Sequence, residues 1–258
     1  MKPVTVIKIG GGLVGSLTRF WGPVREILES RNVILVHGGG PQATAMARRL
    51  GHEPEIVQGR RVTSDLDRDI VRWTMRGEIN LQLSCAAQKA GIPAVGLAGA
   101  DAGLLRVTRR PPWVIQGRSV DFGWVGDVVE VNPRILTTLL EAGYLPVVAP
   151  VGIDEGGADY NVNADTVSVA IAKALGAEEL LFVTEAGGLR SGPGPFDKRI
   201  RQCNREMFEK GTDAGWIQGG MRVKIQLALE AIEGGVNDVW VVGAGDLVER
   251  ANATHITA

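Results

Sequence analysis

The stretch "VTVIKIGGG", residues 4–12, joins a run of mainly apolar residues to three consecutive glycines. An apolar run of this length that ends at glycine is typical of a strand buried on both faces of a parallel sheet. The stretch "NVILVHGGGP", residues 32–41, repeats the design. A helical pattern follows it, in which Pro41 suits the first turn and Gly51 the end. The two stretches predict consecutive strand–loop–helix units.

The same unit recurs along the rest of the chain. Four more apolar runs reach glycine: "PAVGLAG", "YLPVVAPVG", "ELLFVTEAGG" and "DVWVVGAG". Helical patterns lie between the strands, at residues 67–91, 132–143, 164–176 and 220–235. This alternation predicts an α/β fold whose mostly parallel central sheet is covered on both faces. Ligands of such sheets bind at the carboxyl ends of the strands, where the glycine loops lie.

Residues 101–126 interrupt this rhythm. Their pattern predicts short strands with turns, arranged as a hairpin. We expect "RRPPW", residues 109–113, to form an exposed tip with solvated arginines.

Length, hydrophobic content and net charge limit the size of the domain and the kinds of partner that we expect. A length of 258 residues with 45% hydrophobic content suits one large α/β unit or two lobes. A net charge of -1 argues against a general nucleic-acid binder. Residues 1–150 carry 18 Lys and Arg against 13 Asp and Glu, which suggests an anionic partner there unless the charges are scattered by chance.

Cysteine usage and hydropathy indicate a cytoplasmic protein. Cys85 and Cys203 have no CxxC spacing, so we expect reduced thiols and no structural metal. No apolar run approaches the roughly 20 residues that span a bilayer. The chain starts directly with a strand-like segment, so no signal peptide and no membrane partner are expected.

The first two glycine loops are candidates for binding anions. Glycines let the backbone approach phosphate closely, and Lys8 adds a positive charge beside Gly10 and Gly11. In the second loop, Gly39 and Gly40 precede a helix N-terminus, where anions are favoured. Neither loop matches GxxxxGK[ST] or GxGxxG, and a plain tight turn is the alternative for each.

Charged residues elsewhere have two interpretations. An arginine of "QGRRVTS", residues 58–64, could bind a carboxylate with two hydrogen bonds or lie on the surface. Lys224 falls in the first turns of a late helix, where it points into a cleft or is solvated. In "YNVNAD", Asn163 or Asp165 could cap a helix. The alternative is that Asn161, Asn163 and Asp165, at a spacing of two, face the carboxyl-end cleft.

Together these motifs resemble the amino acid kinase family. The resemblance rests on "KIGGG", "HGGGPQ", "GRRVTS", "GGMRVKIQLALEA" and the long segment from "VGDVVEVNPRIL" through "YNVNAD" to "TEAGGL". It implies a three-layer αβα sandwich with a mostly parallel sheet and two lobes within one domain, residues 1–258. A lobe of about residues 1–160 would bind the acyl amino acid and form a dimer interface, and residues 161–258 would bind ATP with Mg²⁺ held mainly by its phosphates.

The members that this chain resembles most closely phosphorylate the side-chain carboxylate of N-acetyl-L-glutamate in arginine biosynthesis. The resemblance therefore implies a role for each matching residue. Lys8, Lys224, Asp165 and Gly11 would be catalytic. The residues expected to bind the acceptor are Gly39, Gly40, Arg61, Asn161 and Asn163. Those expected to bind the nucleotide are Gly10, Thr184, Glu185, Gly187, Gly188, Leu189, Trp216, Ile217 and Gln218.

Some features depart from the family pattern and leave alternatives open. Glu185 stands where the family usually has aspartate, and "RVTS" stands where the family usually has "RVTD" or "RVTP". Only seven residues precede Lys8, whereas arginine-inhibited hexameric members carry an N-terminal helix, so a homodimer is expected. One alternative is a kinase for aminoadipate or glutamate linked to an acidic carrier protein. The other is a non-catalytic regulatory protein with the same fold.

Overall fold

The computed structural model describes residues 2–192 and 198–258. Its centre is an eight-stranded sheet in the order β14-β16-β15-β13-β1-β2-β10-β5. The strands are β1 (Val4–Ile9), β2 (Asn32–His37), β5 (Ala94–Ala98), β10 (Leu145–Ala149), β13 (Glu179–Val183), β14 (Gln202–Cys203), β15 (Asp238–Val242) and β16 (Thr254–Ile256). All their pairings are parallel except that of β15 with β16.

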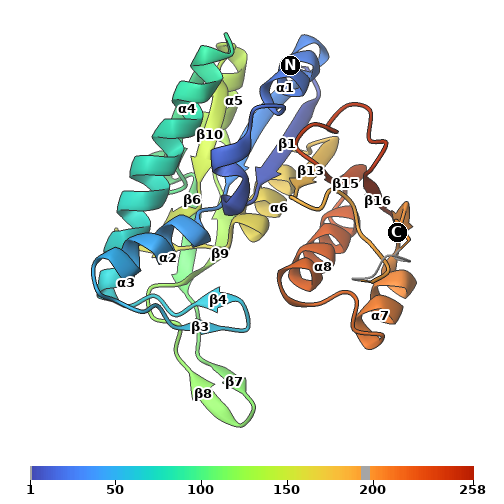
Figure 1. The fold of residues 1–258 in the computed structure, drawn as a ribbon. Helices are drawn as coiled ribbons and strands as arrows, with labels where there is room; N and C mark the ends of the chain where they lie inside the picture. Colours follow the sequence, from blue (N-terminus) through green and yellow to red (C-terminus); the bar gives the residue numbers. More distant parts are fainter. Residues whose placement is uncertain (1, 193–197) are drawn as a thin grey trace.

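Alternate residues of each strand face opposite layers of helices. In β1, Val4 and Val6 join the core against α5 (Arg134–Glu141), α6 (Ala164–Ala174) and α8 (Gly219–Glu233). Ile7 and Ile9 join the core against α1 (Trp21–Ser30), α4 (Asn80–Lys89) and the 3-10 turn η1 (Gly11–Ser16). These layers confirm the αβα sandwich that the sequence predicts (Figure 1).

The helix predicted at residues 67–91 is present as one continuous helical run, but its central turns are π-helical. It consists of α3 (Asp65–Val71), the π-helical η2 (Arg72–Ile79) and α4. Met75 and Ile79 of η2 lie against Gly39 of the second glycine loop. The widened turns therefore pack directly beneath that loop, and π-helical turns are frequent at functional sites.

A smaller antiparallel layer lies beside the central sheet. It has the order β12-β11-β6-β9, made of β12 (Asp159–Asn161), β11 (Val151–Ile153), β6 (Leu105–Arg109) and β9 (Gly126–Val131). One ribbon, β7 (Trp113–Ile115) with β8 (Arg118–Val120), extends from it between β6 and β9, and a second, β3 (Ile56–Val57) with β4 (Arg60–Arg61), belongs to the segment before α3 (Figure 1). The predicted hairpin over residues 101–126 is thus confirmed. The remaining elements are α2 (Gly40–Arg49), η3 (Asp101–Gly103) and α7 (Arg205–Asp213).

The expectation that "RRPPW" forms the exposed tip is wrong, because β7 begins at Trp113 and the turn of the ribbon lies at Gln116 and Gly117. The expectation of solvated arginines holds for only one of the two. Arg109 is exposed, but the side chain of Arg110 is only 6% exposed and pairs with Asp127. Trp113 packs edge-on against the buried Phe122, with ring centroids 5.3 Å apart. Prolines and arginines suggested a solvated tip, but the fold places the start of this segment against the base of the ribbon.

No helix in the described part of the chain is long and apolar enough to cross a membrane. Within the same residues, Cys85 and Cys203 are both free thiols.

Candidate functional site

The two glycine loops meet because their strands are neighbours. Strands β1 and β2 run parallel, with Ile9 beside His37. The turns after them approach so closely that a Cβ on Gly11 would lie 2.9 Å from the backbone nitrogen of Gly39. Such a Cβ would also lie 3.0 Å from Pro41 Cδ. Only glycine therefore permits this contact, which makes the two loops one continuous backbone surface.

This surface suits an anion. Helix α2 begins at Gly40, and a helix N-terminus presents backbone N–H groups and a partial positive charge. The Gln42 side chain donates a 2.7 Å hydrogen bond to Gly11 O and ties the helix to the first loop. Anion binding by the two loops stays a prediction.

Three charged side chains converge beside the loops. A single oxygen of Asp165, Oδ1, lies 2.7 Å from Lys8 Nζ and 2.8 Å from Lys224 Nζ. Lys8 faces the same layer as Val4 and Val6, which is the layer of α6 and α8 that carries Asp165 and Lys224. All three side chains are buried to 12% exposure or less.

Burial and mutual charge set the ionisation of this triad. Burial acts to raise the pKa of Asp165, but the charges of Lys8 and Lys224 outweigh it and lower that pKa. Burial, aided by the neighbouring charge of Lys8, lowers the pKa of Lys224 to about 8, although Asp165 opposes the shift. Two ammonium groups share one carboxylate, so the triad keeps one positive charge in excess.

The stretch "YNVNAD" divides its polar residues between two tasks. Asn163 is the N-cap of α6, and its Oδ1 accepts a 3.0 Å hydrogen bond from Thr166 N. Asp165 points inward to the lysines and has no capping role. Asn161 donates from Nδ2 to Thr63 Oγ1 at 3.2 Å. The capping interpretation therefore holds for Asn163 and fails for Asp165.

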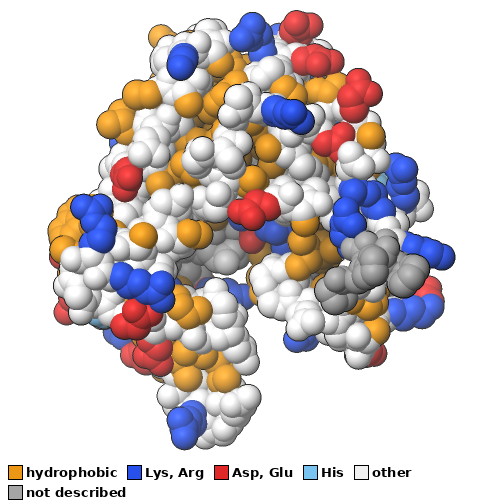
Figure 2. Space-filling model, in the orientation of Figure 1, with side chains coloured by type: hydrophobic (Ala, Val, Ile, Leu, Met, Phe, Trp, Pro, Cys, Tyr) orange, Lys and Arg blue, Asp and Glu red, His pale blue; other side chains and the backbone are white. Residues whose placement is uncertain are grey.

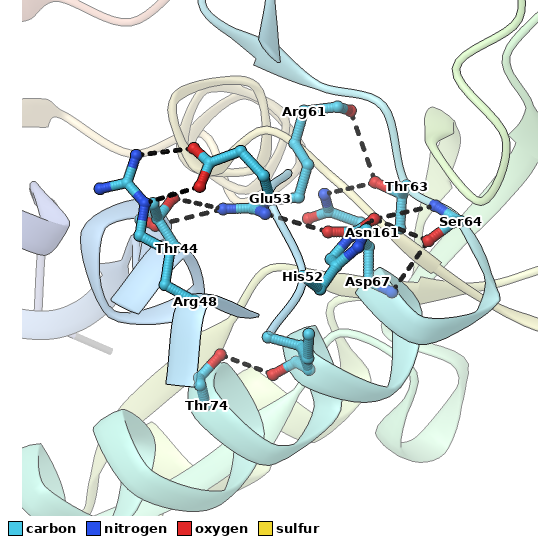
Figure 3. A network of polar contacts seen from close by, with 12 residues as sticks. Thr44, Arg48, His52, Glu53, Arg61, Thr63, Ser64, Asp67, Thr74 and Asn161 are labelled. Carbon is cyan, nitrogen blue, oxygen red and sulfur yellow. Dashed lines mark hydrogen bonds and ion pairs between the residues drawn. The ribbon is translucent and has the colours of Figure 1, made fainter. Parts of the chain in front are cut away.

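Arg61 is held in a network of its own (Figure 3). Its guanidinium donates to Asp67 Oδ1 at 3.0 Å and to Thr44 Oγ1 at 2.7 Å. Asp67 also completes a capping box with Ser64 and lies 3.0 Å from His52 Nε2. Burial acts to raise the pKa of Asp67, and these partners lower it.

A cleft of about 300 Å³ extends from Lys8 and Asp165 of the triad to the arginines, and Lys224 is not among its lining residues. Its wall includes Lys8, Gly11, Gly39, Gly40, Arg61, Asn161, Asn163 and Asp165. Figure 2 shows the surface hollowed between the part that carries the β7–β8 ribbon and the part that carries α8. The structure thus brings together every residue that the sequence assigned to the acceptor.

The residues assigned to the nucleotide lie outside this cleft's wall. Thr184, Gly187 and Gly188 form the turn after β13, where Gly187 N donates to Thr184 O. The side chains of Leu189 and Ile217 are buried in the core, which leaves only their backbone to contact a ligand. Trp216, Ile217 and Gln218 directly precede α8, which carries Lys224.

Glu185 takes an exposed position over the first glycine loop. Its carboxylate lies against Gly12, so a side chain at residue 12 would collide with it. Gly10 lies at the base of that loop, at the end of β1. An exposed carboxylate at this place suits a cation that accompanies phosphate groups. No cluster of three or more potential metal ligands occurs within residues 2–192 and 198–258.

Sequence reasoning missed four polar residues that shape the site. His37 is fully buried, and burial lowers its pKa to about 4, so its ring is neutral. Asn80 contacts His37 Nε2 at 3.1 Å and donates to Val147 O at 2.8 Å, which links the second loop to β10. Asp67 and Arg110 were missed because their burial depends on distant segments. The only sequence feature that pointed to Asp67 and Arg110 was the density of charged residues in "RRVTSDLDRD" and in the "RR" of residues 109–110.

The chain is similar to known proteins in sequence and in fold. Residues 3–243 match the model of the amino acid kinase family. The chain is 39% identical to the acetylglutamate kinase of Symbiobacterium thermophilum over 92% of this chain and 83% of that protein. It is 39% identical to the acetylglutamate kinase of Geobacillus kaustophilus over 100% and 96% of the two chains. The crystal structure of smu.665 from Streptococcus mutans superposes with a TM-score of 0.85, at 26% identity and complete coverage of both chains.

The contact between the loops can be tested without knowledge of the ligand. We expect Gly11→Ala to lower the melting temperature, because its Cβ would meet Gly39 and Pro41 at 2.9 to 3.0 Å. Overpacking of this kind costs about 1–3 kcal/mol. Gly15→Ala is the matched control, since a Cβ there meets nothing within 4 Å. Equal melting temperatures for the two variants would refute the close contact.

Proposed function

Because the chain belongs to the amino acid kinase family, we propose that it transfers the γ-phosphoryl group of ATP to the side-chain carboxylate of N-acetyl-L-glutamate. The product would be N-acetyl-L-glutamyl 5-phosphate, an intermediate of arginine biosynthesis. The observation that carries this proposal is the contact of one Asp165 oxygen with both Lys8 and Lys224 beside the paired glycine loops.

The triad suits the charge that develops during phosphoryl transfer. An oxygen of the acceptor carboxylate attacks the γ-phosphorus, and the bond from that phosphorus to the β–γ bridging oxygen breaks to release ADP. Catalysis of this step depends on alignment and charge stabilisation more than on covalent chemistry by the protein. Lys8 and Lys224 would face the oxygens of the transferring group, and Asp165 would hold both lysines in place. The acceptor carboxylate is ionised at neutral pH, so no general base is needed.

The acceptor would lie in the cleft between the triad and Arg61. The reacting carboxylate would meet the backbone of Gly11, Gly39 and Gly40, and the α-carboxylate would meet Arg61 and Asn161. In this proposal the first lobe, about residues 1–160, supplies the acceptor site. The second lobe, about residues 161–258, supplies the nucleotide site through the turn after β13 and the segment before α8.

We propose that Mg²⁺ enters with ATP, bound mainly by its phosphates. When bound, it would neutralise part of the charge on the phosphate groups. Glu185 over Gly12 fits this cation, because an exposed carboxylate can accept hydrogen bonds from waters of its hydration shell.

A homodimer also stays a proposal. Exposed apolar side chains on the α3–η2–α4 run, among them Leu66, Trp73 and Leu81, offer a surface that a second copy could cover.

The decisive experiment is trapping of the product. The protein is incubated with ATP, Mg²⁺, N-acetyl-L-glutamate and hydroxylamine, which converts an acyl phosphate into a coloured hydroxamate. We expect hydroxamate and ADP to form in equal amounts. A protein that binds both ligands without forming ADP would be the non-catalytic alternative. Formation of product only from an acceptor linked to an acidic carrier would establish the other alternative.

Removal of either lysine should abolish most turnover. We expect Lys8→Ala and Lys224→Ala each to lower kcat by ~10²-fold or more, because each removes a charge that faces the transferring group. Asp165→Asn should lower kcat as well, while the folded state persists by circular dichroism. Lys210→Ala on α7 is the control, since that lysine is 68% exposed and its ion-pair partner among the described residues is Glu206. Near-normal kcat in Lys8→Ala or Lys224→Ala would remove that lysine from the mechanism.

The pH dependence should report Lys224. Its pKa of about 8 implies that the free enzyme loses this charge as the pH rises through 8. We therefore expect kcat/KM for ATP to fall above pH 8, and Lys224→Arg to shift that fall to higher pH. The unfolded chain binds the additional proton between pH 8 and 10.5, so this titration adds to stability as the pH rises. A flat profile up to pH 10 would contradict the assignment.

A further inference from the structure

The loop between β15 and β16, residues 243–253, reaches the turn after β13 that is assigned to the nucleotide (Figure 1). Gly188 N of that turn donates a 2.9 Å hydrogen bond to Asn252 O. The next backbone nitrogen, that of Leu189, donates to Thr254 Oγ1 at 2.7 Å. The contact is tight, because a Cβ on Gly188 would lie 2.8 Å from Asn252 O. The position of the turn therefore depends on where the loop places Asn252.

One carboxylate organises the end of this loop. Asp246 Oδ2 accepts a 2.7 Å hydrogen bond from Asn252 N, and its Oδ1 accepts a 3.0 Å bond from Ala251 N. The backbone nitrogen of Asp246 donates to Gly243 O at 3.0 Å, which fixes the residue relative to the end of β15. Hydrogen bonds from backbone N–H groups to a carboxylate are stronger than those between neutral groups. Asp246 therefore sets where the chain returns toward β16.

The carbonyl groups of the same two residues are also held. Arg201 donates from Nη1 to Ala251 O at 2.9 Å, and Arg199 donates to Asn252 O. Asn252 O has two lone pairs, so it can accept from Arg199 and from the turn after β13 at once. The contacts with Ala251 and Asn252 form a clamp, made by Asp246, Arg199 and Arg201. The clamp leaves the returning backbone little freedom to move.

The turn that the clamp anchors lies beside the first glycine loop, since the carboxylate of Glu185 lies against Gly12. The N–H groups of Gly188 and Leu189 are already used by the 243–253 loop and by β16. Within the described part of the chain, those of Glu185 and Ala186 have no hydrogen-bond acceptor. One half of the turn is thus anchored, and the other half can donate to the oxygens of a phosphate group.

We propose that Asp246 is a positioning residue for the nucleotide. Its carboxylate holds Asn252 O where that oxygen anchors the turn, so that the free N–H groups of Glu185 and Ala186 meet the phosphate groups. This inference rests on the nucleotide site of the proposed function, and Asp246 does not line the acceptor cleft. A carboxylate normally repels a polyphosphate, but backbone N–H groups occupy both oxygens of Asp246. It therefore acts through geometry and not through charge.

The test replaces the carboxylate by an amide of the same shape. In Asp246→Asn, one acceptor oxygen becomes an NH2 group, which faces a backbone N–H group and cannot accept its hydrogen bond. We expect KM for ATP in the hydroxamate assay to rise about three- to tenfold, the usual effect of losing a hydrogen bond. KM for N-acetyl-L-glutamate and kcat should each change by less than about twofold.

Glu249→Gln is the matched control, because Glu249 is an exposed acid of the same loop. Both variants remove one negative charge. If Asp246 acted only through its charge, both variants would bind the anionic ATP more tightly and lower its KM. The clamp instead predicts a rise in Asp246→Asn and a KM for ATP within about twofold of wild type in Glu249→Gln.

Two measurements repeat the comparison without turnover. Calorimetric titration with ADP should show binding to Asp246→Asn that is weaker by about the same factor. Hydrogen exchange at the amides of Gly188 and Leu189 should become about three- to tenfold faster, because their anchor is loosened. Exchange in β1 should stay that of wild type, and melting temperatures establish that each variant is folded.

The outcomes separate this inference from the proposed function. Hydroxamate formation with equal KM for ATP in Asp246→Asn and Glu249→Gln would overturn the role of Asp246 alone. An equal rise in KM for both substrates would also overturn it, because a general loss of structure would then explain the effect. Wild-type protein that binds ADP but forms no hydroxamate would overturn the proposed function alone, and the titrations would still decide the role of Asp246. Wild-type protein that binds no ADP would overturn both.

Discussion

The site depends on one carboxylate that holds two ammonium groups. Asp165 contacts Lys8 and Lys224 through a single oxygen, and all three side chains are buried. Without Asp165, two buried positive charges would repel each other, and burial already lowers the pKa of Lys224. The three residues come from β1, α6 and α8, so their meeting requires the central sheet and one helical layer to be in register.

The glycine loops impose a steric constraint in addition to the electrostatic constraint of the triad. Gly11 and Gly39 touch through their backbones because β1 and β2 are parallel neighbours. The π-helical segment η2 packs against Gly39. Asn80 contacts the neutral ring of His37 and thereby links this loop to β10. A rigid surface of backbone groups thus lies beside the charged triad. Preorganised dipoles and charges of this kind stabilise a transition state without reorganisation during the reaction.

The arginines in the wall of the cleft are in different electrostatic states. Arg61 is neutralised by Asp67, Arg110 is paired with Asp127, and Arg60 is unpaired within the described residues. Equal counts of arginine in a sequence therefore conceal unequal net charges in the cleft. What distinguishes the three is which carboxylate, if any, the fold brings into contact with each guanidinium.

The sequence by itself determined the fold class and pointed to most of the residues that line the candidate site. Apolar runs that end at glycine, alternating with helical patterns, imply a parallel sheet because that is how such strands and helices bury their apolar faces. The motifs around Lys8, Gly39, Arg61, Asp165 and Lys224 identified residues that the structure does bring together.

Only the tertiary structure decided which layer Lys8 faces, since strand alternation defines two faces but not the helices that cover them. It also decided that Asn163 caps α6 while Asp165 binds lysines, and that Arg110 is buried rather than solvated. Burial and pairing between distant segments are properties of packing, and no local pattern of residues encodes them.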